Sequence, residues 1–276
     1  MISRAYAASR TKSPFGEFPG RRNLLGSGFA GSTKKQSSTD SDYRKAFPAR
    51  GRGLRRPGSL AAGLVIPRLP PRAVVGSAVM KCLVVVAHPL PESLCCALAA
   101  SAAEALRAAG HEVWLEDLYR DEFAAALTAA ERASYYGHPY DSSAVRPRID
   151  RLVAAEGLVV CFPTWWFGFP AILKGWFDRV WAPGVAYDHA DDFGPIRPRL
   201  RNLRRTLVVT SLGAPWWVDW LVLRRPVRRV LKTAILGACA PACKFDMLTI
   251  YKAERLRRTQ VERLSARMKA RLGGWK

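Results

Sequence analysis

Residues 157–180 read GLVVCFPTWWFGFPAILKGWFDRV, and this stretch decides the fold. Its first six residues, 157–162, are an apolar run of the kind that forms a buried strand. Pro170 suits the first position of a helix, because its missing N–H would have no partner there, and a helix is expected over 171–181. The loop 163–170 holds four aromatic residues. In an open parallel sheet such a loop lies at the carboxyl edge of the strands, where ligands bind. Its composition favours a flat, apolar ligand.

Apolar and helical patterns alternate along the rest of the chain from Met80 onward. Short apolar runs predict four further strands, over 81–87, 111–118, 205–211 and 243–250. Helices are expected over 94–109, 128–136, 144–155, 218–236 with a break near Pro226, and 253–272. Five strands alternating with helices predict the α/β class, with a doubly wound, five-stranded parallel sheet in three α/β/α layers.

The first 79 residues differ from the rest in composition. They hold 15 lysines and arginines against three acidic residues, and so carry +12 of the formal net charge of +22. Ser, Gly, Pro and Arg are abundant there, so 1–79 is expected to be a disordered, basic N-terminal extension. It could be a targeting segment, a nucleic-acid-binding arm or sequence upstream of the true start, since Met80 directly precedes the first strand. One domain is expected over 80–276.

The cysteine spacing argues against a zinc site, and the hydropathy pattern argues against a membrane span. The six cysteines include no C-x-x-C pair, which disfavours a zinc site. They are expected to be reduced thiols of a cytoplasmic protein. The apolar stretches 157–173 and 206–223 are interrupted by prolines, glycines or an acidic residue. A helix across lipid needs about 20 apolar residues, so no membrane span is expected.

The loop after the first strand, His88-Pro89-Leu90-Pro91-Glu92-Ser93, stands directly before a helix. Free N–H groups and the helix dipole make a helix N-terminus a site for phosphate. Ser93 would add a hydroxyl and His88 a donor, although Ser93 is also typical of a residue that only caps its helix. This loop shares one sheet edge with 163–170 and 211–217. A phosphate site beside two aromatic loops fits a phosphorylated planar ring, for which a flavin is the natural candidate.

Two motifs resemble those of the flavin-dependent NAD(P)H:quinone oxidoreductases, the DT-diaphorase-like family with a flavodoxin-like fold. They are the run 163–180 and the run 84–93, VVVAHPLPES. The resemblance covers about 81–252 and implies a bound FAD, with FMN as the alternative, and NAD(P)H as co-substrate. It also implies two-electron, ping-pong hydride transfer to a quinone or similar acceptor, and a homodimer with sites at the interface.

The resemblance also assigns roles to individual residues. The flavin phosphates would be held by His88, Ser93 and Leu94. The ring would be framed by Pro163, Thr164, Trp165, Trp166 and Phe167 and, at its other edge, by Thr210, Ser211 and Gly213. Catalytic roles would fall to Tyr187, which matches a tyrosine lining the substrate pocket, and to His189, which stands in place of a second one. His189 could stabilise charge on a reduced quinone or donate a proton, or be an ordinary loop histidine.

The chain departs from the family pattern at several positions. Leu212 replaces one of two glycines, and Cys95 replaces an asparagine. Trp216 and Trp217 stand where the best-known members have the Tyr and His that assist hydride transfer. These departures bear on the substrate and on proton handling more than on the flavin, which carries the hydride chemistry itself.

Charged residues outside these motifs admit more than one interpretation. A solvated loop explains Asp188, Asp191 and Asp192 better than a metal site, and no metal is expected. The basic runs 197–205 and 224–232 could attract the 2′-phosphate of NADPH, touch nucleic acid or form a solvated face. The sequence favours a flavin-dependent NAD(P)H oxidoreductase. The alternatives are a flavin-binding electron carrier or regulatory protein of the same fold, and a nucleic-acid-binding protein acting through its basic arm.

Overall fold

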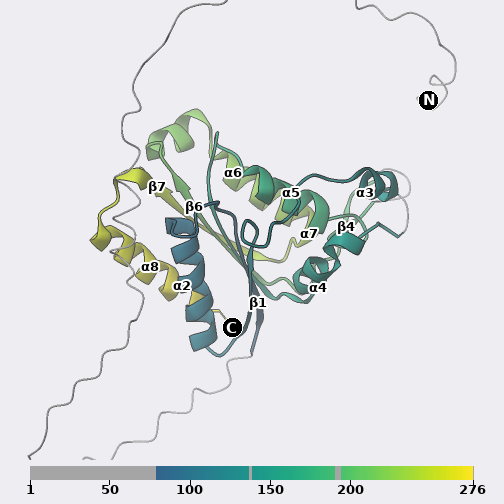
Figure 1. The fold of residues 1–276 in the computed structure, drawn as a ribbon, viewed down its shortest axis with the longest axis horizontal. Helices are drawn as coiled ribbons and strands as arrows, with labels where there is room; N and C mark the ends of the chain where they lie inside the picture. Colours follow the sequence, from purple (N-terminus) through teal and green to yellow (C-terminus); the bar gives the residue numbers. More distant parts are fainter. Residues whose placement is uncertain (1–78, 137–138, 190–193, 276) are drawn as a thin grey trace, which may run out of the picture. The chain divides into compact units, whose positions relative to one another are not determined.

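The computed structural model describes residues 79–136, 139–189 and 194–275. The predicted extension 1–79 lies outside these ranges except for Val79, as do Asp191 and Asp192. Five strands form one sheet (Figure 1): β1 (Lys81–Val86), β2 (Glu112–Asp117), β3 (Gly157–Pro163), β6 (Arg205–Leu212) and β7 (Lys244–Tyr251).

The strand order in this sheet is β2-β1-β3-β6-β7, and every neighbouring pair is parallel. The predicted doubly wound, five-stranded α/β fold is therefore confirmed. The chain runs from β1 out to the edge strand β2 and then crosses back to β3 on the other side of β1. The carboxyl ends of β1 and β3 thus meet at the point where the strand order reverses, which is where such sheets bind ligands.

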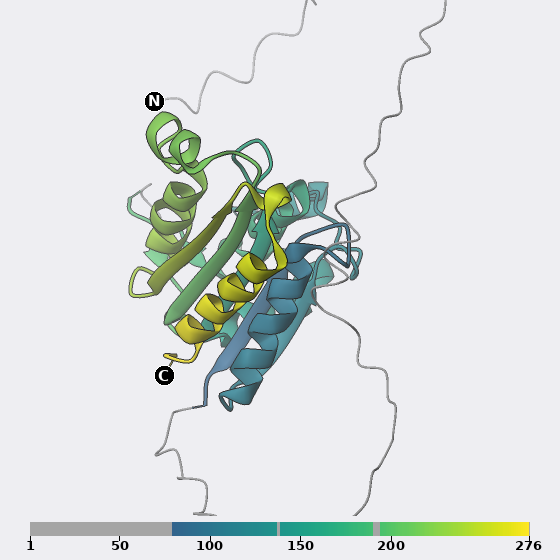
Figure 2. The same ribbon diagram turned by 90° about the vertical axis from the view of Figure 1, so that its left-hand side faces the viewer.

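Helices cover both faces of the sheet. Figure 2 shows α2 (Leu94–Ala108) and α8 (Arg258–Leu272) side by side on one face. The other face carries α4 (Arg146–Ala154), α5 (Ala171–Val180) and a helical stretch made of α6 (Pro226–Arg229), η3 (Val230–Leu236) and α7 (Gly237–Cys239). Alternate strand residues supply the two cores, because successive side chains point to opposite faces. Val84 packs with α2 and α8, whereas Val85 packs with α4 and α5.

Several elements differ from their predicted bounds. The last helix begins at Arg258 rather than at 253, because Lys252 has a positive φ of 51° and a 3₁₀ turn, η4 (Ala253–Arg255), comes first. The connection before β6 contains a short hairpin of β4 (Tyr187–Asp188) and β5 (Arg197–Pro198). The remaining elements are α3 (Ala129–Ser134), η1 (Ser143–Val145) and the π-helical η2 (Val218–Val222). None of the described helices is long and apolar enough to cross a membrane.

Helix α5 packs so closely at Gly175 that we expect Gly175→Ala to destabilise the fold. A Cβ on Gly175 would overlap the backbone carbonyl of Ala125. Overpacking of this kind costs about 1–3 kcal/mol of unfolding free energy. Urea denaturation measures the loss. The matched control is Gly237→Ala, whose Cβ would lie 3.4 Å from the Lys232 carbonyl oxygen. Equal stability of the two variants would contradict the prediction.

Candidate functional site

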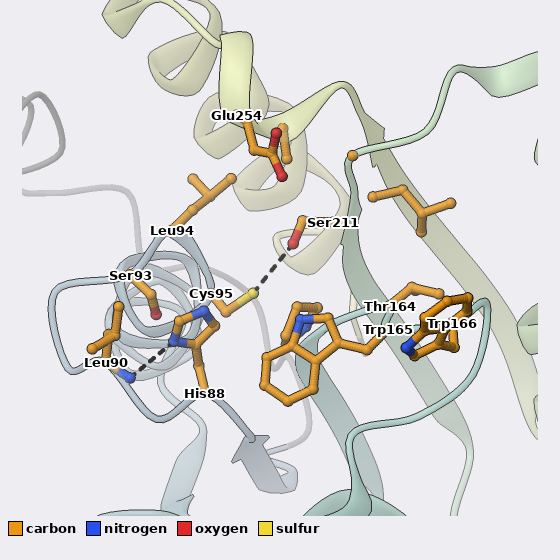
Figure 3. A pocket seen from close by; sticks show the side chains of 14 residues that line it. His88, Leu90, Ser93, Leu94, Cys95, Thr164, Trp165, Trp166, Ser211 and Glu254 are labelled. Carbon is orange, nitrogen blue, oxygen red and sulfur yellow. Dashed lines mark hydrogen bonds between the residues drawn. The ribbon is translucent and has the colours of Figure 1, made fainter. Parts of the chain in front are cut away.

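A cavity of about 430 Å³ opens at the carboxyl edge of the sheet. Its walls come from the loops after β1, β3, β6 and β7 (Figure 3). Nine of the predicted site residues line it: His88, Ser93, Leu94, Pro163, Thr164, Trp165, Trp166, Ser211 and Gly213. The structure thus brings together residues that lie up to 125 positions apart in the sequence.

The N-terminus of α2 forms the first wall of the cavity. Ser93 is the N-cap residue, and its Oγ accepts a hydrogen bond of 3.2 Å from the Cys96 amide. Ser93 therefore caps α2, which is one of the two roles that the sequence allowed for it, the other being phosphate binding. The cap does not use the amides of Leu94 and Cys95. These amides occupy the first helical positions and have no acceptor within the helix. No acidic residue lies in the first turn of α2, so this wall suits an anion.

His88 stands opposite the aromatic loop. Its Nδ1 accepts a hydrogen bond of 3.0 Å from the Leu90 amide, so the proton of the neutral ring is on Nε2. Its ring centroid lies 6.3 Å from that of Trp165. Figure 3 shows the Trp165 side chain between His88 and Trp166. One side of the cavity is therefore polar and the other is aromatic.

The aromatic loop is a tight turn. The Gly168 amide donates to the Trp165 carbonyl at 2.9 Å, and the two central residues, Trp166 and Phe167, have φ of 50° and 55°. Positive φ at both central positions is typical of a type I′ turn. Bulky residues rarely adopt it, at a cost of order 1–3 kcal/mol each. The Trp166 side chain is fully exposed beside the cavity, whereas Phe167 does not line it.

Short hydrogen bonds join this loop to the end of β6. The Thr164 amide donates to the Ser211 carbonyl at 2.8 Å, and the Oγ1 atoms of Thr164 and Thr210 lie 2.6 Å apart. Thr210 is buried below the cavity and does not line it. Cys95 Sγ lies 3.6 Å from Ser211 Oγ, and burial raises the pKa of this thiol to about 12. Cys95 is therefore a neutral thiol at pH 7, where it lines the cavity beside α2.

Part of the cavity wall was not predicted from the sequence. Five residues that line the cavity were not among the predicted site residues: Leu90, Cys95, Leu212, Ala253 and Glu254. Glu254 Oε1 lies 3.3 Å from the place that a Cβ on Gly213 would occupy, so this carboxylate closes the cavity over Gly213. The signal was available, because Glu254 follows the fifth strand at the same carboxyl edge as the other three loops.

The two predicted catalytic residues do not line this cavity within one chain. Tyr187 lies in a second cavity of about 300 Å³, with Phe169, Phe177 and Trp181. The Tyr187 hydroxyl lies 3.1 Å from the Tyr135 hydroxyl. The pKa of Tyr187 is raised above its ordinary value, mainly by burial and to a smaller extent by this hydrogen bond. The His189 ring packs edge-on against Tyr187 at 5.2 Å. Both residues therefore belong to the β4–β5 hairpin region.

Two arginines of the basic run 197–205 form ion pairs with nearby acidic side chains. Arg199 forms an ion pair of 2.9 Å with Asp188, and Arg204 forms one of 2.9 Å with Glu156. Asp188 therefore belongs to an ion pair of the hairpin. Among the described residues, no group of three or more His, Cys, Asp or Glu side chains could hold a metal ion.

Comparisons with known proteins agree with this geometry. Residues 80–273 match the family described as "Flavodoxin-like fold". NAD(P)H dehydrogenase [quinone] 1 of Cavia porcellus is 34% identical over 156 residues, which cover 50% of this chain and 55% of that protein. A ribosyldihydronicotinamide dehydrogenase-like protein of Penicillium crustosum is 29% identical over 70% of this chain and 80% of its own.

Solved structures give the same grouping. The NAD(P)H:quinone oxidoreductase from Methanothermobacter marburgensis superposes with a TM-score of 0.58 at 27% identity, over 71% of this chain and 95% of that one. The chain spans about half the length of the first curated relatives that it matches. The family match nevertheless covers all five strands and every wall of the cavity. The chain belongs to the flavodoxin-like family, as a relative of the NAD(P)H:quinone oxidoreductases.

Proposed function

We propose that the protein is a flavin-dependent NAD(P)H oxidoreductase that reduces quinones or similar acceptors by two electrons. The observation that carries the proposal is the cavity, which combines the N-terminus of α2 with the aromatic turn at Trp165 and Trp166. The names of the relatives, which include NAD(P)H dehydrogenase [quinone] and NAD(P)H:quinone oxidoreductase, support the same reaction class.

The residues present fit a flavin, and we propose FAD with FMN as the alternative. The N–H groups of Leu94 and Cys95 and the hydroxyl of Ser93 would bind phosphate, with no acidic residue in that first turn of α2. Trp165 offers an aromatic surface to the ring, and the turn it begins is fixed by its own hydrogen bond. A bound flavin would supply hydride chemistry, from NAD(P)H to the acceptor in ping-pong order.

The proton-handling groups are proposed to come from a second copy of the chain in a homodimer. Tyr187 and His189 lie together in the hairpin region, outside the cavity of their own chain. The raised pKa of Tyr187 keeps its hydroxyl protonated at neutral pH, so it could donate a hydrogen bond to an acceptor oxygen. All six cysteines are free thiols, which fits the cytoplasmic location that we propose.

A second candidate is a flavin-binding electron carrier or regulatory protein without quinone reductase activity. The absence of Tyr187 and His189 from the cavity of a single chain favours it. Two measurements on the purified full chain decide. A flavin absorption spectrum, with the released cofactor identified by chromatography, tests flavin binding. Oxidation of NADH or NADPH with a soluble quinone then tests the activity. A protein that neither holds nor takes up flavin contradicts both candidates, and a bound flavin without turnover leaves the carrier.

A further inference from the structure

The cavity that is proposed to hold the flavin is lined by a single acidic side chain, Glu254. None of the 14 residues that line the cavity is a lysine or an arginine, although the chain holds 44 of them. The two cations nearest to Glu254 in the sequence, Lys252 and Arg255, are exposed and do not line the cavity. The proposed phosphate site therefore shares its cavity with one carboxylate and with no lysine or arginine to offset it.

Glu254 belongs to the 3₁₀ turn η4, which backbone hydrogen bonds hold in place. The Arg255 amide donates to the Lys252 carbonyl at 2.9 Å, and the Lys252 amide donates to the Ala214 carbonyl, in the loop after β6, at 3.4 Å. The carboxylate lies over Gly213, where its Oε1 is 3.3 Å from the place that a Cβ would occupy. Within the described part of the chain, Glu254 forms neither an ion pair nor a side-chain hydrogen bond. Its carboxylate is therefore free to bind a ligand.

Glu254 stands beside the proposed phosphate site and apart from the aromatic turn. η4 leads directly into α8, which packs side by side with α2 (Figure 2), and both helices begin at the carboxyl edge of the sheet. The turn that carries Glu254 thus lies next to the N-terminus of α2. Figure 3 shows the Glu254 side chain above Leu94 and Ser211, away from Trp165 and Trp166.

The two candidate flavins differ in what they bring to this position. In FMN the phosphate ends the molecule and, as a monoester, carries about two negative charges at pH 7. In FAD each phosphate carries one charge, and the adenosine that follows presents the hydroxyl groups of its ribose. A carboxylate repels the first arrangement and accepts charge-assisted hydrogen bonds from the second. In dinucleotide sites of doubly wound sheets, an acidic residue likewise binds ribose hydroxyls.

We infer that Glu254 selects FAD over FMN, by accepting hydrogen bonds from the adenosine ribose and by repelling the terminal phosphate of FMN. This selection rests on the proposed flavin-dependent function, to which it adds the residue that decides the cofactor. Glu254 is a specificity residue and takes no part in hydride transfer, because the flavin ring is proposed to lie at the aromatic turn.

Titration of the flavin-free full chain with FAD, FMN and riboflavin, followed by tryptophan fluorescence, tests this selection by binding alone. The wild type should bind FAD more tightly than FMN. Glu254→Ala should weaken FAD binding about ten- to hundredfold, the loss typical of a hydrogen bond to a charged group. FMN should bind this variant at least as tightly as the wild type, and riboflavin, which has neither phosphate nor adenosine, should bind both equally. Glu254→Gln keeps a neutral acceptor and should have an intermediate affinity for FAD.

Glu104→Ala is the matched control, because it removes an exposed carboxylate of α2 that does not line the cavity. It should leave all three affinities unchanged, and circular dichroism checks that every variant is folded. An equal loss of FAD, FMN and riboflavin binding in Glu254→Ala would overturn the proposal, because Glu254 would then contact the part that all three flavins share. An unchanged ratio of FAD to FMN affinity would overturn it as well. Both outcomes leave flavin binding itself intact, whereas a wild-type chain that takes up none of the three flavins would overturn the proposed function and the role of Glu254 together.

Discussion

Replacing Ser93 with aspartate should reduce the affinity for phosphorylated flavins by about a hundredfold while leaving the fold intact. Aspartate is as good an N-cap as serine, so α2 keeps the hydrogen bond now made to the Cys96 amide. The new carboxylate, however, would stand where the phosphate is proposed to bind. Two like charges about 4 Å apart repel by about 1 kcal/mol in water and about 4 kcal/mol near a protein surface, which brackets the expected loss.

Titration of flavin-free protein, followed by tryptophan fluorescence, measures this effect. FMN and FAD should both bind more weakly to Ser93→Asp, whereas riboflavin, which lacks phosphate, should bind as to the wild type. Ser93→Asn keeps a capping side chain without the charge and is the matched control. If Ser93→Asp bound FMN and FAD as tightly as Ser93→Asn, the phosphate would not lie at the N-terminus of α2.

Arg179→Met should destabilise the fold by about 3–5 kcal/mol, because it leaves a buried carboxylate without its partner. Arg179 and Glu131 are each 3% exposed, and the guanidinium binds the carboxylate through two nitrogens at 2.7–3.0 Å. This pair ties α3 to α5, the helix that follows the aromatic turn. Chemical denaturation at pH 7 measures the loss.

The acidity of Glu131 provides the control and the pH dependence. Burial alone would raise its pKa, but the hydrogen bonds from Arg179 and Thr128 outweigh burial and lower it. In the wild type this pair stabilises the fold above the ordinary pKa of glutamate, about 4.3, and its contribution is lost as the pH falls. Loss of the Arg179 hydrogen bonds and charge should raise the pKa of the Glu131 carboxyl in Arg179→Met, so the deficit should shrink on acidification. Adding Glu131→Gln, which can still form the capping box with Thr128, should restore much of the stability. A deficit that neither acidification nor Glu131→Gln reduces would show that lost packing, not the unpaired charge, destabilises the variant.

The fold could be predicted from the sequence because its three central strands, β1, β3 and β6, are buried on both faces and read as continuous apolar runs. The run 157–162 needed only its apolar character and the following prolines to be read as strand and turn. Once five strands alternate with helices, the loops at the carboxyl edge come together by topology, so the sequence alone places His88, Trp165 and Ser211 in one site. The local apolar patterns and the rules for connecting parallel strands therefore predicted the same arrangement.

Other features run against the preferences of the residues that adopt them, or appear only in the folded chain. The left-handed conformation of Trp166 and Phe167 runs against residue preference and is held by the loop's own hydrogen bond. The late start of α8 depends on Lys252, which also adopts a positive φ. Tyr187 was assigned to the site by family resemblance alone, and only the folded chain shows that it lies in a different cavity.

The strand order has a consequence for the protein while it is being synthesised. β3 pairs with β1 on one side, but its other neighbour, β6, leaves the ribosome only some 40 residues later. During that interval the nascent chain has half of the cavity wall and an open strand edge whose residues, Gly157–Pro163, are all buried in the finished protein. Unpaired apolar edges of this kind lead to aggregation. Until translation reaches β6, the strand that precedes the aromatic turn is therefore an edge at which nascent chains can aggregate.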